Sequence, residues 1–185
     1  MKRVQPTVVF VPGLRDHVAD HWQTLLAEHY PGSSTVPRLG GGILSRDAWV
    51  DALDRTIQSV PGDVLLVAHS AGVMMVVHWA QSHGHAIRGA LLATPADLEQ
   101  PLPVGYPTID ALRTAGWLPV PRKPLPFPSI VAASTNDPLA QYDRIAGYGA
   151  DWRSRIVNLG AVGHLNPAAG YGVWAGAEDL IGDLC

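Results

Sequence analysis

Three side chains that together could attack a carbonyl group each follow an apolar stretch of this chain. Ser70 comes shortly after the apolar run 64–68, Asp137 follows residues 129–133, and His164 follows residues 155–159. A serine hydroxyl is a weak nucleophile at neutral pH and needs a base that accepts its proton. Histidine can be that base, and an aspartate can fix its tautomer and stabilise the imidazolium. The three residues therefore predict nucleophilic catalysis at Ser70.

Ser70 lies within a pattern of small residues, Ala68-His69-Ser70-Ala71-Gly72. The apolar run before it is typical of a buried strand, and residues 73–79 show the apolar face of a helix. A serine at the apex of a tight strand-to-helix turn is called a nucleophile elbow. Ala68 stands where the first glycine of this motif is usual. The alternative is that Ser70 only caps the following helix.

The elements that must position these residues alternate regularly along the chain. Apolar or β-branched runs predict strands at 7–11, 34–39, 64–68, 87–93, 129–133 and 155–159. Helices are predicted at 21–30, 45–60, after the elbow, and at 108–115, 138–149 and 173–184. Such alternation favours an α/β fold, with about six mostly parallel strands in a three-layer αβα sandwich. Residues 1–185 are expected to form one domain, and Pro37 assigns the second strand to an edge.

In a parallel sheet, functional residues gather beyond the carboxyl ends of the strands. That rule brings Ser70, Asp137 and His164 to one rim, and the order Ser…Asp…His is that of α/β-hydrolases. The backbone N–H groups of Leu14 and Ala71 are expected to stabilise a developing oxyanion.

Each of these assignments has a plainer alternative. Asp137 could cap a helix with Pro138 at its first position, and His164 could be a surface histidine. The other candidate acids are Asp97, Asp110 and Asp143, but none follows a strand as directly as Asp137.

The composition excludes several classes of protein. Apolar residues make up 47% of the 185 residues and charged residues 16%, which indicates a globular protein. With a formal charge of −3, the chain has no excess of positive charge that would attract nucleic acid or an anionic membrane. Cys185 is the single cysteine, and no run of eighteen apolar residues predicts a membrane span. We therefore expect a cytoplasmic protein without an internal disulfide.

The remaining histidines suggest no metal site. His17 and His21 are four residues apart, but no third ligand is evident and no metal is expected. His78, together with 83 and 85, is assigned to a solvated helix end. His69 is expected to point away from Ser70 and to make packing or structural hydrogen bonds.

Nine prolines between Pro95 and Pro128 predict a stiff surface excursion from the sheet. With this excursion as its border, the substrate site is expected to be a shallow cleft. The side chains predicted to line it are Trp117, Leu118, Leu125 and Phe127.

Over nearly its whole length the chain resembles the small serine hydrolases of the retinoblastoma-binding-protein-9 and YdeN type. The motifs that carry the resemblance are Val11-Pro12-Gly13-Leu14, His21-Trp22-Gln23, Trp49-Val50, Val67-Ala68-His69-Ser70-Ala71-Gly72, Leu125-Pro126-Phe127-Pro128-Ser129, Asn136-Asp137-Pro138 and Gly163-His164-Leu165-Asn166. The resemblance implies a minimal α/β-hydrolase with the triad Ser70, Asp137 and His164, no cofactor and no cap domain. It also explains Ala68, because the elbow of this family often lacks the first glycine.

The loop after the first strand departs from the family pattern, which is usually rich in glycine and serine. This chain has Arg15-Asp16-His17-Val18 there, so Arg15 and His17 are expected to line the substrate site and restrict what enters it. Residues 38–44 also depart, with three glycines where the family usually has an acidic and aromatic segment.

The expected activity is carboxylesterase-like hydrolysis of small esters, and also of amides, through an acyl-enzyme intermediate. Two alternatives stay open: a catalytically weak binding or scaffold protein with the same fold, and an acyltransferase. The expected partner is a small-molecule ester or amide substrate, and the sequence identifies no protein partner.

Overall fold

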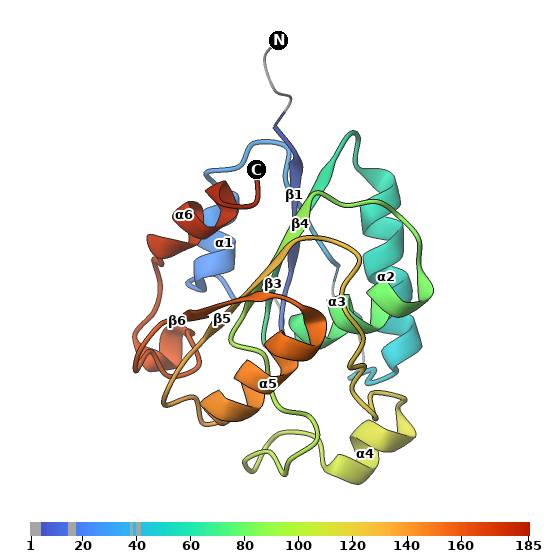
Figure 1. Cartoon of the computed structure of the whole chain (residues 1–185), viewed down its shortest axis with the longest axis vertical. Coiled ribbons are helices and arrows are strands. Elements are labelled where there is room, and N and C mark those ends of the chain that lie inside the picture. The colour runs from blue at the N-terminus through green and yellow to red at the C-terminus, as the bar shows by residue number, and fades with distance from the viewer. Residues whose placement is uncertain (1–4, 15–17, 38, 40–41) are drawn as a thin grey trace.

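Six parallel strands of the described part of the chain form one sheet in the order β2-β1-β3-β4-β5-β6 (Figure 1). The computed structural model describes residues 5–14, 18–37, 39 and 42–185. The strands are β1 (Thr7–Val11), β2 (Ser34–Thr35), β3 (Val64–His69), β4 (Gly89–Ala93), β5 (Ser129–Ala133) and β6 (Arg155–Asn158). Each pair of neighbouring strands is parallel, which confirms the predicted parallel sheet.

In the part of the chain that the structure describes, six α-helices and one 3₁₀ turn lie between these strands or follow the last of them. They are α1 (Trp22–Ala27), α2 (Arg46–Ser59), α3 (Ala71–Ser82), α4 (Ile109–Thr114), α5 (Tyr142–Trp152), η1 (Pro167–Ala169) and α6 (Gly176–Gly182). Helix α2 begins after Ser45, whose hydroxyl accepts a hydrogen bond from the Ala48 N–H. Within these ranges no helix has the length and apolarity needed to cross a membrane.

Alternate residues of every strand except β2 contribute to two separate cores. In β1, Val9 and Val11 face the core formed with α2, α3 and α5, whereas Val8 and Phe10 face the core formed with α1 and α6. The helices therefore cover both faces of the sheet, as Figure 1 shows. This is the three-layer αβα sandwich predicted from the alternation of strands and helices.

The second strand is shorter than predicted. Strand β2 spans only Ser34–Thr35, at the edge of the sheet next to β1. The last bond of this pairing runs from the Val36 N–H to the Phe10 carbonyl (2.9 Å), and Pro12, which follows β1, has no N–H with which to continue it.

Candidate active site

Ser70 stands on a strained turn between the central strand β3 and helix α3. Its φ of 57° and ψ of −124° lie outside the regions that non-glycine residues usually adopt. Such a conformation costs on the order of 1–3 kcal/mol and persists only where the surroundings enforce it. The Ser70 N–H donates to the Ala93 carbonyl at the end of β4 (3.1 Å). The hydroxyl makes no capping bond to α3, so Ser70 is more than a helix cap.

Gly72 lets the end of β1 lie against the elbow. A Cβ at this position would lie 2.3 Å from the Val11 carbonyl oxygen and 2.6 Å from that of Pro12, so no larger residue fits. A Cβ on Gly13 would likewise lie 3.0 Å from the Ser70 Cβ. The loop after β1, including Leu14, therefore lies close to the serine.

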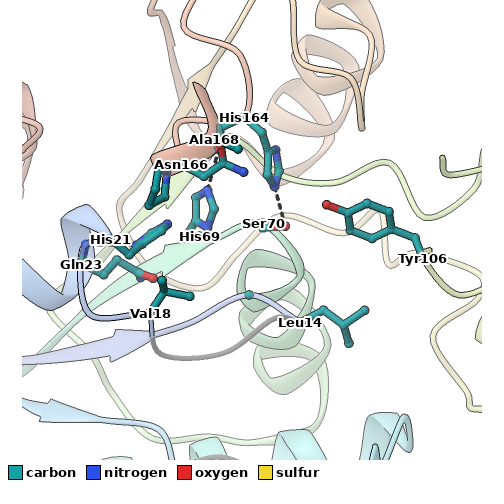
Figure 2. A pocket seen from close by; sticks show the side chains of 12 residues that line it. Leu14, Val18, His21, Gln23, His69, Ser70, Tyr106, His164, Asn166 and Ala168 are labelled. Atoms are coloured by element: carbon teal, nitrogen blue, oxygen red, sulfur yellow. Dashed lines mark hydrogen bonds between the residues drawn. The ribbon is translucent and has the colours of Figure 1, made fainter. Parts of the chain in front are cut away.

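A line of hydrogen bonds joins Ser70 to the two other predicted residues. The Ser70 Oγ lies 2.8 Å from His164 Nε2, as the dashed line in Figure 2 marks. On the other side of the ring, His164 Nδ1 lies 2.8 Å and 3.0 Å from the two oxygens of Asp137. The side chains of His164 and Asp137 are only 7% and 3% exposed. A neutral His164 in this geometry donates a hydrogen bond from Nδ1–H to Asp137 and accepts a hydrogen bond from the Ser70 hydroxyl at Nε2.

Asp137 caps a turn and not, as the alternative interpretation supposed, helix α5. Its Oδ1 accepts a hydrogen bond from the Leu139 N–H (2.8 Å), but α5 begins only at Tyr142, with Gln141 as its N-cap. The predicted helix start at 138 is therefore wrong. The turn holds the Asp137 carboxylate toward His164. The same side chain therefore accepts a hydrogen bond from the Leu139 N–H and contacts the histidine ring.

The loop that carries His164 is tied to the ends of the neighbouring strands. The Asn136 side-chain oxygen accepts hydrogen bonds from the Gly163 N–H (2.6 Å) and the Ser134 hydroxyl (3.0 Å). The His164 carbonyl lies 2.9 Å from His69 Nε2. Burial holds the pKa of His69 well below its usual value, and the nearby His164 and His21 lower it further. A neutral His69 therefore donates its Nε2–H to that carbonyl.

His69 does not point away from the site, as strand alternation suggested. Its ring lies 4.9 Å from that of His164 and 4.6 Å from that of His21, measured between centroids. The predicted structural hydrogen bond is present, but the ring also lines the cavity beside Ser70.

A cavity of about 180 Å³ opens beside the Ser70 hydroxyl (Figure 2). The described residues that line it are Gly13, Leu14, Val18, His21, Gln23, His69, Ser70, Tyr106, His164, Asn166, Pro167 and Ala168. Sequence reasoning assigned no role in the site to Val18, His21, Gln23, Tyr106 or residues 166–168. Three of them belong to motifs of the family resemblance, His21 and Gln23 in residues 21–23 and Asn166 in residues 163–166, and Val18 ends the unusual loop 15–18.

Gln23 joins the ends of two strands beneath the cavity. Its Nε2 donates to the carbonyl oxygens of Val67 (2.9 Å) and Val11 (3.3 Å), on β3 and β1. Its backbone N–H donates to Nδ1 of His21 (3.2 Å). These bonds hold the His21 ring at the wall of the cavity.

The aromatic residues predicted to line the cleft lie elsewhere. Trp117 is buried, donates Nε1–H to the Leu44 carbonyl (2.6 Å), and packs edge-on against Trp49. Phe127 is buried beside Trp79 in the core, and Leu118 packs against the same core, as does Leu125. The excursion turns these side chains inward because they bury apolar area there. From this excursion Tyr106 reaches the cavity instead.

Two other predicted lining residues, Arg15 and His17, lie outside the described residues, so the His17–His21 pair does too. Among the residues that are described, no group of three or more histidine, cysteine or acidic side chains could hold a metal ion.

The alternative acids lie away from Ser70. Asp97 is only 1% exposed, but its carboxylate is bound by Arg144 and by the Tyr148 hydroxyl. Asp110 pairs with Arg113 at the surface, and Asp143 lies exposed in the first turn of α5. Of the four candidates, the structure places Asp137 next to the histidine.

His78 corrects the assignment of a solvated helix end. Its side chain is buried, and its Nε2 lies 3.0 Å from the Trp117 carbonyl. Burial lowers its pKa to about 4, although the bond to that carbonyl raises it. The ring is therefore neutral at pH 7 and packs from α3 against Trp117, in the segment after α4.

A parallel sheet with a serine on a strained strand-to-helix turn, followed along the chain by an acid and a histidine, defines an α/β-hydrolase. Residues 8–183 match the family model described as "Serine hydrolase", so the chain belongs to this family and is a hydrolase.

Solved structures show the same fold. A protein described as a YdeN-like hydrolase from Pectobacterium atrosepticum is 29% identical, with a TM-score of 0.80 over 97% of this chain and 92% of that one. The YdeN protein of B. subtilis is 16% identical, with a TM-score of 0.73 over 97% and 98% of the two chains. An esterase domain from Rhodothermus marinus is 15% identical, with a TM-score of 0.61 over 91% and 83%. No curated protein sequence matches the chain.

Proposed function

We propose that this hydrolase cleaves small carboxylic esters through an acyl-enzyme intermediate on Ser70. The observation that supports this most is the hydrogen-bond line from Asp137 through His164 to Ser70, which ends at a cavity open to a substrate. In the proposed triad Ser70 is the nucleophile, His164 is the acid–base and Asp137 orients it.

In the first half of the reaction, Ser70 Oγ attacks the ester carbonyl carbon while its proton passes to Nε2 of His164. The carbonyl electron pair moves to the oxygen and gives a tetrahedral oxyanion. When that oxygen re-forms the double bond, the bond to the alcohol oxygen breaks. His164 returns the proton to the leaving oxygen, which releases the alcohol and leaves the acyl group on Ser70.

In the second half, water takes the place of the serine. His164 accepts a proton from the water, the hydroxide oxygen attacks the acyl carbon, and the bond to Ser70 Oγ breaks. The proton on Nε2 passes to Oγ, so that the carboxylic acid leaves and the free serine is restored. Asp137 stays ionised throughout and stabilises each imidazolium.

The oxyanion requires two donors, for which we propose the backbone N–H groups of Ala71 and Leu14. Ala71 begins helix α3, so its N–H lies at the end of the helix dipole that favours negative charge. Leu14 lies in the loop held against the elbow through Gly13 and Gly72. A donor of this type contributes on the order of 3 kcal/mol to transition-state stabilisation.

The test is to incubate the purified protein with p-nitrophenyl acetate and with a fluorophosphonate probe. We expect hydrolysis and covalent labelling of the wild type, and loss of both in Ser70→Ala. Ser82→Ala, at the far end of the same helix, is the matched control and is expected to retain both.

Failure of the wild type to label, with the same trace hydrolysis in Ser70→Ala, would sink the hydrolytic mechanism. That outcome would favour the binding or scaffold alternative. Product analysis with an added alcohol separates hydrolysis from acyl transfer, because transfer forms a second ester.

A further inference from the structure

A second hollow adjoins the cavity beside Ser70. It has a volume of about 410 Å³ and shares two wall residues, Leu14 and Tyr106, with the first cavity. In Figure 2 these two side chains lie on one side of Ser70, and Val18, His21 and Gln23 lie on the other. The hydroxyl end of Tyr106 is turned toward Ser70 in this view. The second hollow therefore continues the site past the serine.

The described side chains that line this hollow are uncharged and mostly apolar. The described residues that line it are Leu14, Leu39, Gly42, Ile43, Leu44, Trp49, Gly105, Tyr106 and Pro107, none of which carries a charge. Ile43 is 45% exposed, one of few large apolar side chains on the described surface that are open to solvent. The lining fits an uncharged apolar group better than a carboxylate or an ammonium.

Two indole groups hold one wall in place. The Trp49 Nε1–H donates to the Ile43 carbonyl (2.8 Å), and the Trp117 Nε1–H donates to that of Leu44 (2.6 Å). The two indole rings pack edge to face, with centroids 6.4 Å apart. This wall is thus preformed, which reduces the entropy lost when a ligand binds.

The volumes indicate that the first cavity does not hold a whole substrate. Pockets that enclose a small organic ligand usually measure about 300–1,000 Å³. The cavity of about 180 Å³ beside Ser70 falls below this range, whereas the adjoining hollow of about 410 Å³ falls within it. The adjoining hollow past Leu14 and Tyr106 therefore offers the space that a substrate larger than an acetyl ester needs.

The position of His164 decides which part of the substrate extends there. His164 must protonate the leaving oxygen, so the alcohol of the ester has to lie on the side of this ring. His164 lines the first cavity but not the second hollow. The acyl group, on the other side of the carbonyl carbon, is then directed toward Leu14 and the second hollow.

We infer that the hollow formed by Leu14, Ile43, Leu44, Trp49, Tyr106 and Pro107 is the acyl subsite, and that the preferred substrates are esters of uncharged acids with an aromatic ring or a branched apolar chain. The inference rests on the proposed function and adds the substrate class to it. It makes Ile43 and its neighbours determinants of acyl specificity, without a part in bond cleavage.

The test compares two esters that share one alcohol, p-nitrophenyl 3-phenylpropanoate and p-nitrophenyl acetate. In the wild type, kcat/KM is expected to be at least ten times higher for the phenylpropanoate. Ile43→Asp places a charge in the apolar wall and is expected to lower that ratio about tenfold. Ile43→Asn, similar in size but uncharged, should lower the ratio less.

The matched control is Val173→Asp, which also changes an exposed β-branched residue to aspartate. Val173 lies beside α1 and α6, in neither of the two hollows near Ser70. The ratio of the two esters is expected to equal that of the wild type. Ile43 and Val173 are both partly or largely exposed, so thermal unfolding of each variant should match the wild type closely.

A second pair of esters, 1-naphthyl acetate and p-nitrophenyl acetate, varies the alcohol and keeps the acyl group. The ratio for this pair should not change in Ile43→Asp. A change in this ratio without a change in the acyl ratio would place the alcohol in the hollow and overturn the inference. Equal hydrolysis of both p-nitrophenyl esters by the wild type would also overturn it, while the proposed function stood. If the wild type hydrolysed no ester and did not label at Ser70, both would fall.

Discussion

Two buried carboxylates lie just beyond neighbouring strands of the sheet and have opposite surroundings. Asp97 follows β4 and receives hydrogen bonds from Arg144 Nε (2.7 Å), Arg144 Nη2 (3.1 Å) and the Tyr148 hydroxyl (2.7 Å). Asp137 follows β5 and meets the His164 ring and the Leu139 N–H. Asp97 is paired with a permanent cation, whereas Asp137 is paired with a ring that can be neutral or charged.

The difference separates a structural carboxylate from a candidate catalytic one. Burial would raise the pKa of Asp97, but the hydrogen bonds from Arg144 and Tyr148 outweigh it and lower the pKa. Its charge is thus already balanced in the resting protein. The charge next to His164 is free to stabilise an imidazolium that forms during a reaction. A buried aspartate near a strand end indicates a catalytic acid only when its partner can change charge.

The residues around Asp97 fasten the proline-rich excursion to α5. This Asp97 cluster consists of Asp97, Glu99, Arg122, Arg144 and Tyr148. Arg122 donates to Glu99 (2.6 Å) and Asp151 (3.0 Å), and its guanidinium lies 4.0 Å from the centre of the Tyr148 ring. The Asp97 N–H donates to the Leu139 carbonyl (3.1 Å). Since Leu139 also donates to Asp137, the structural cluster braces the turn that carries the candidate catalytic acid.

The largest effect is expected for Asp137→Asn, which tests whether Asp137 has a catalytic or a structural role. The amide cannot stabilise an imidazolium and favours the wrong tautomer of His164, so we expect kcat/KM for p-nitrophenyl acetate to fall about 10³- to 10⁴-fold. The amide oxygen still accepts from Leu139, so the free energy of unfolding should change by less than about 1 kcal/mol. Ester assays and urea denaturation measure the two effects. A loss of stability with little loss of activity would assign Asp137 to the structural class.

The opposite pattern is expected for Asp97→Asn. This change leaves Arg144 without its buried anionic partner, and we expect the free energy of unfolding to fall by about 2–3 kcal/mol. Tyr148→Phe removes one donor and keeps the ion pair, so it serves as the milder control, at about 1 kcal/mol. Activity per folded molecule should fall less than tenfold in both. A thousandfold loss in a folded Asp97→Asn protein would contradict the structural assignment.

The smallest expected effect is the loss of stability when the protein is acidified. His78 binds a proton at about pH 6.5 in the unfolded chain but only near pH 4 in the folded protein. Between these values the unfolded chain binds more protons, so the free energy of unfolding falls as the pH falls, by on the order of 2 kcal/mol. The lowered pKa of Asp97 acts only at lower pH, because its contribution is lost as the pH falls below the ordinary range of an aspartate.

Urea denaturation of the wild type and of His78→Phe at several pH values between 4.5 and 7 measures this loss. Phenylalanine keeps the ring but does not titrate, so the variant should lose less stability on acidification. The buried His69, whose pKa is also lowered, accounts for the slope that remains. Identical slopes in both proteins would show that His78 does not cause the acid sensitivity.

The strands and the rim were predictable because apolar runs and the rule for parallel sheets constrain them directly. The elbow at Ser70 and the strand ends before Asp137 and His164 required only local pattern and chain order. The start of α5 was not predictable, because the turn at Asp137 also makes contacts with Asp97 and His164, which are distant in the sequence. Local propensity alone favoured a helix from Pro138.

The cavity walls were predicted least well. Tyr106 and Trp117 belong to one proline-rich segment, and no periodicity indicates which of them turns toward Ser70. Trp117 turns inward because its indole N–H finds the Leu44 carbonyl and its ring packs on Trp49. The inward position of Trp117 also explains why His78 is buried, because the partner of the His78 ring is the Trp117 carbonyl. These contacts join distant segments, which is information that spacing does not carry.

Gln23 gives the rim a property that no triad residue supplies. Carbonyl oxygens at the carboxyl ends of parallel strands carry lone pairs that would repel a substrate oxygen gaining negative charge. The Gln23 amide nitrogen donates to the carbonyl oxygens of Val11 and Val67, so two acceptors at these strand ends are already paired within the protein. Gln23 does for the end of this sheet what a capping side chain does for the end of a helix.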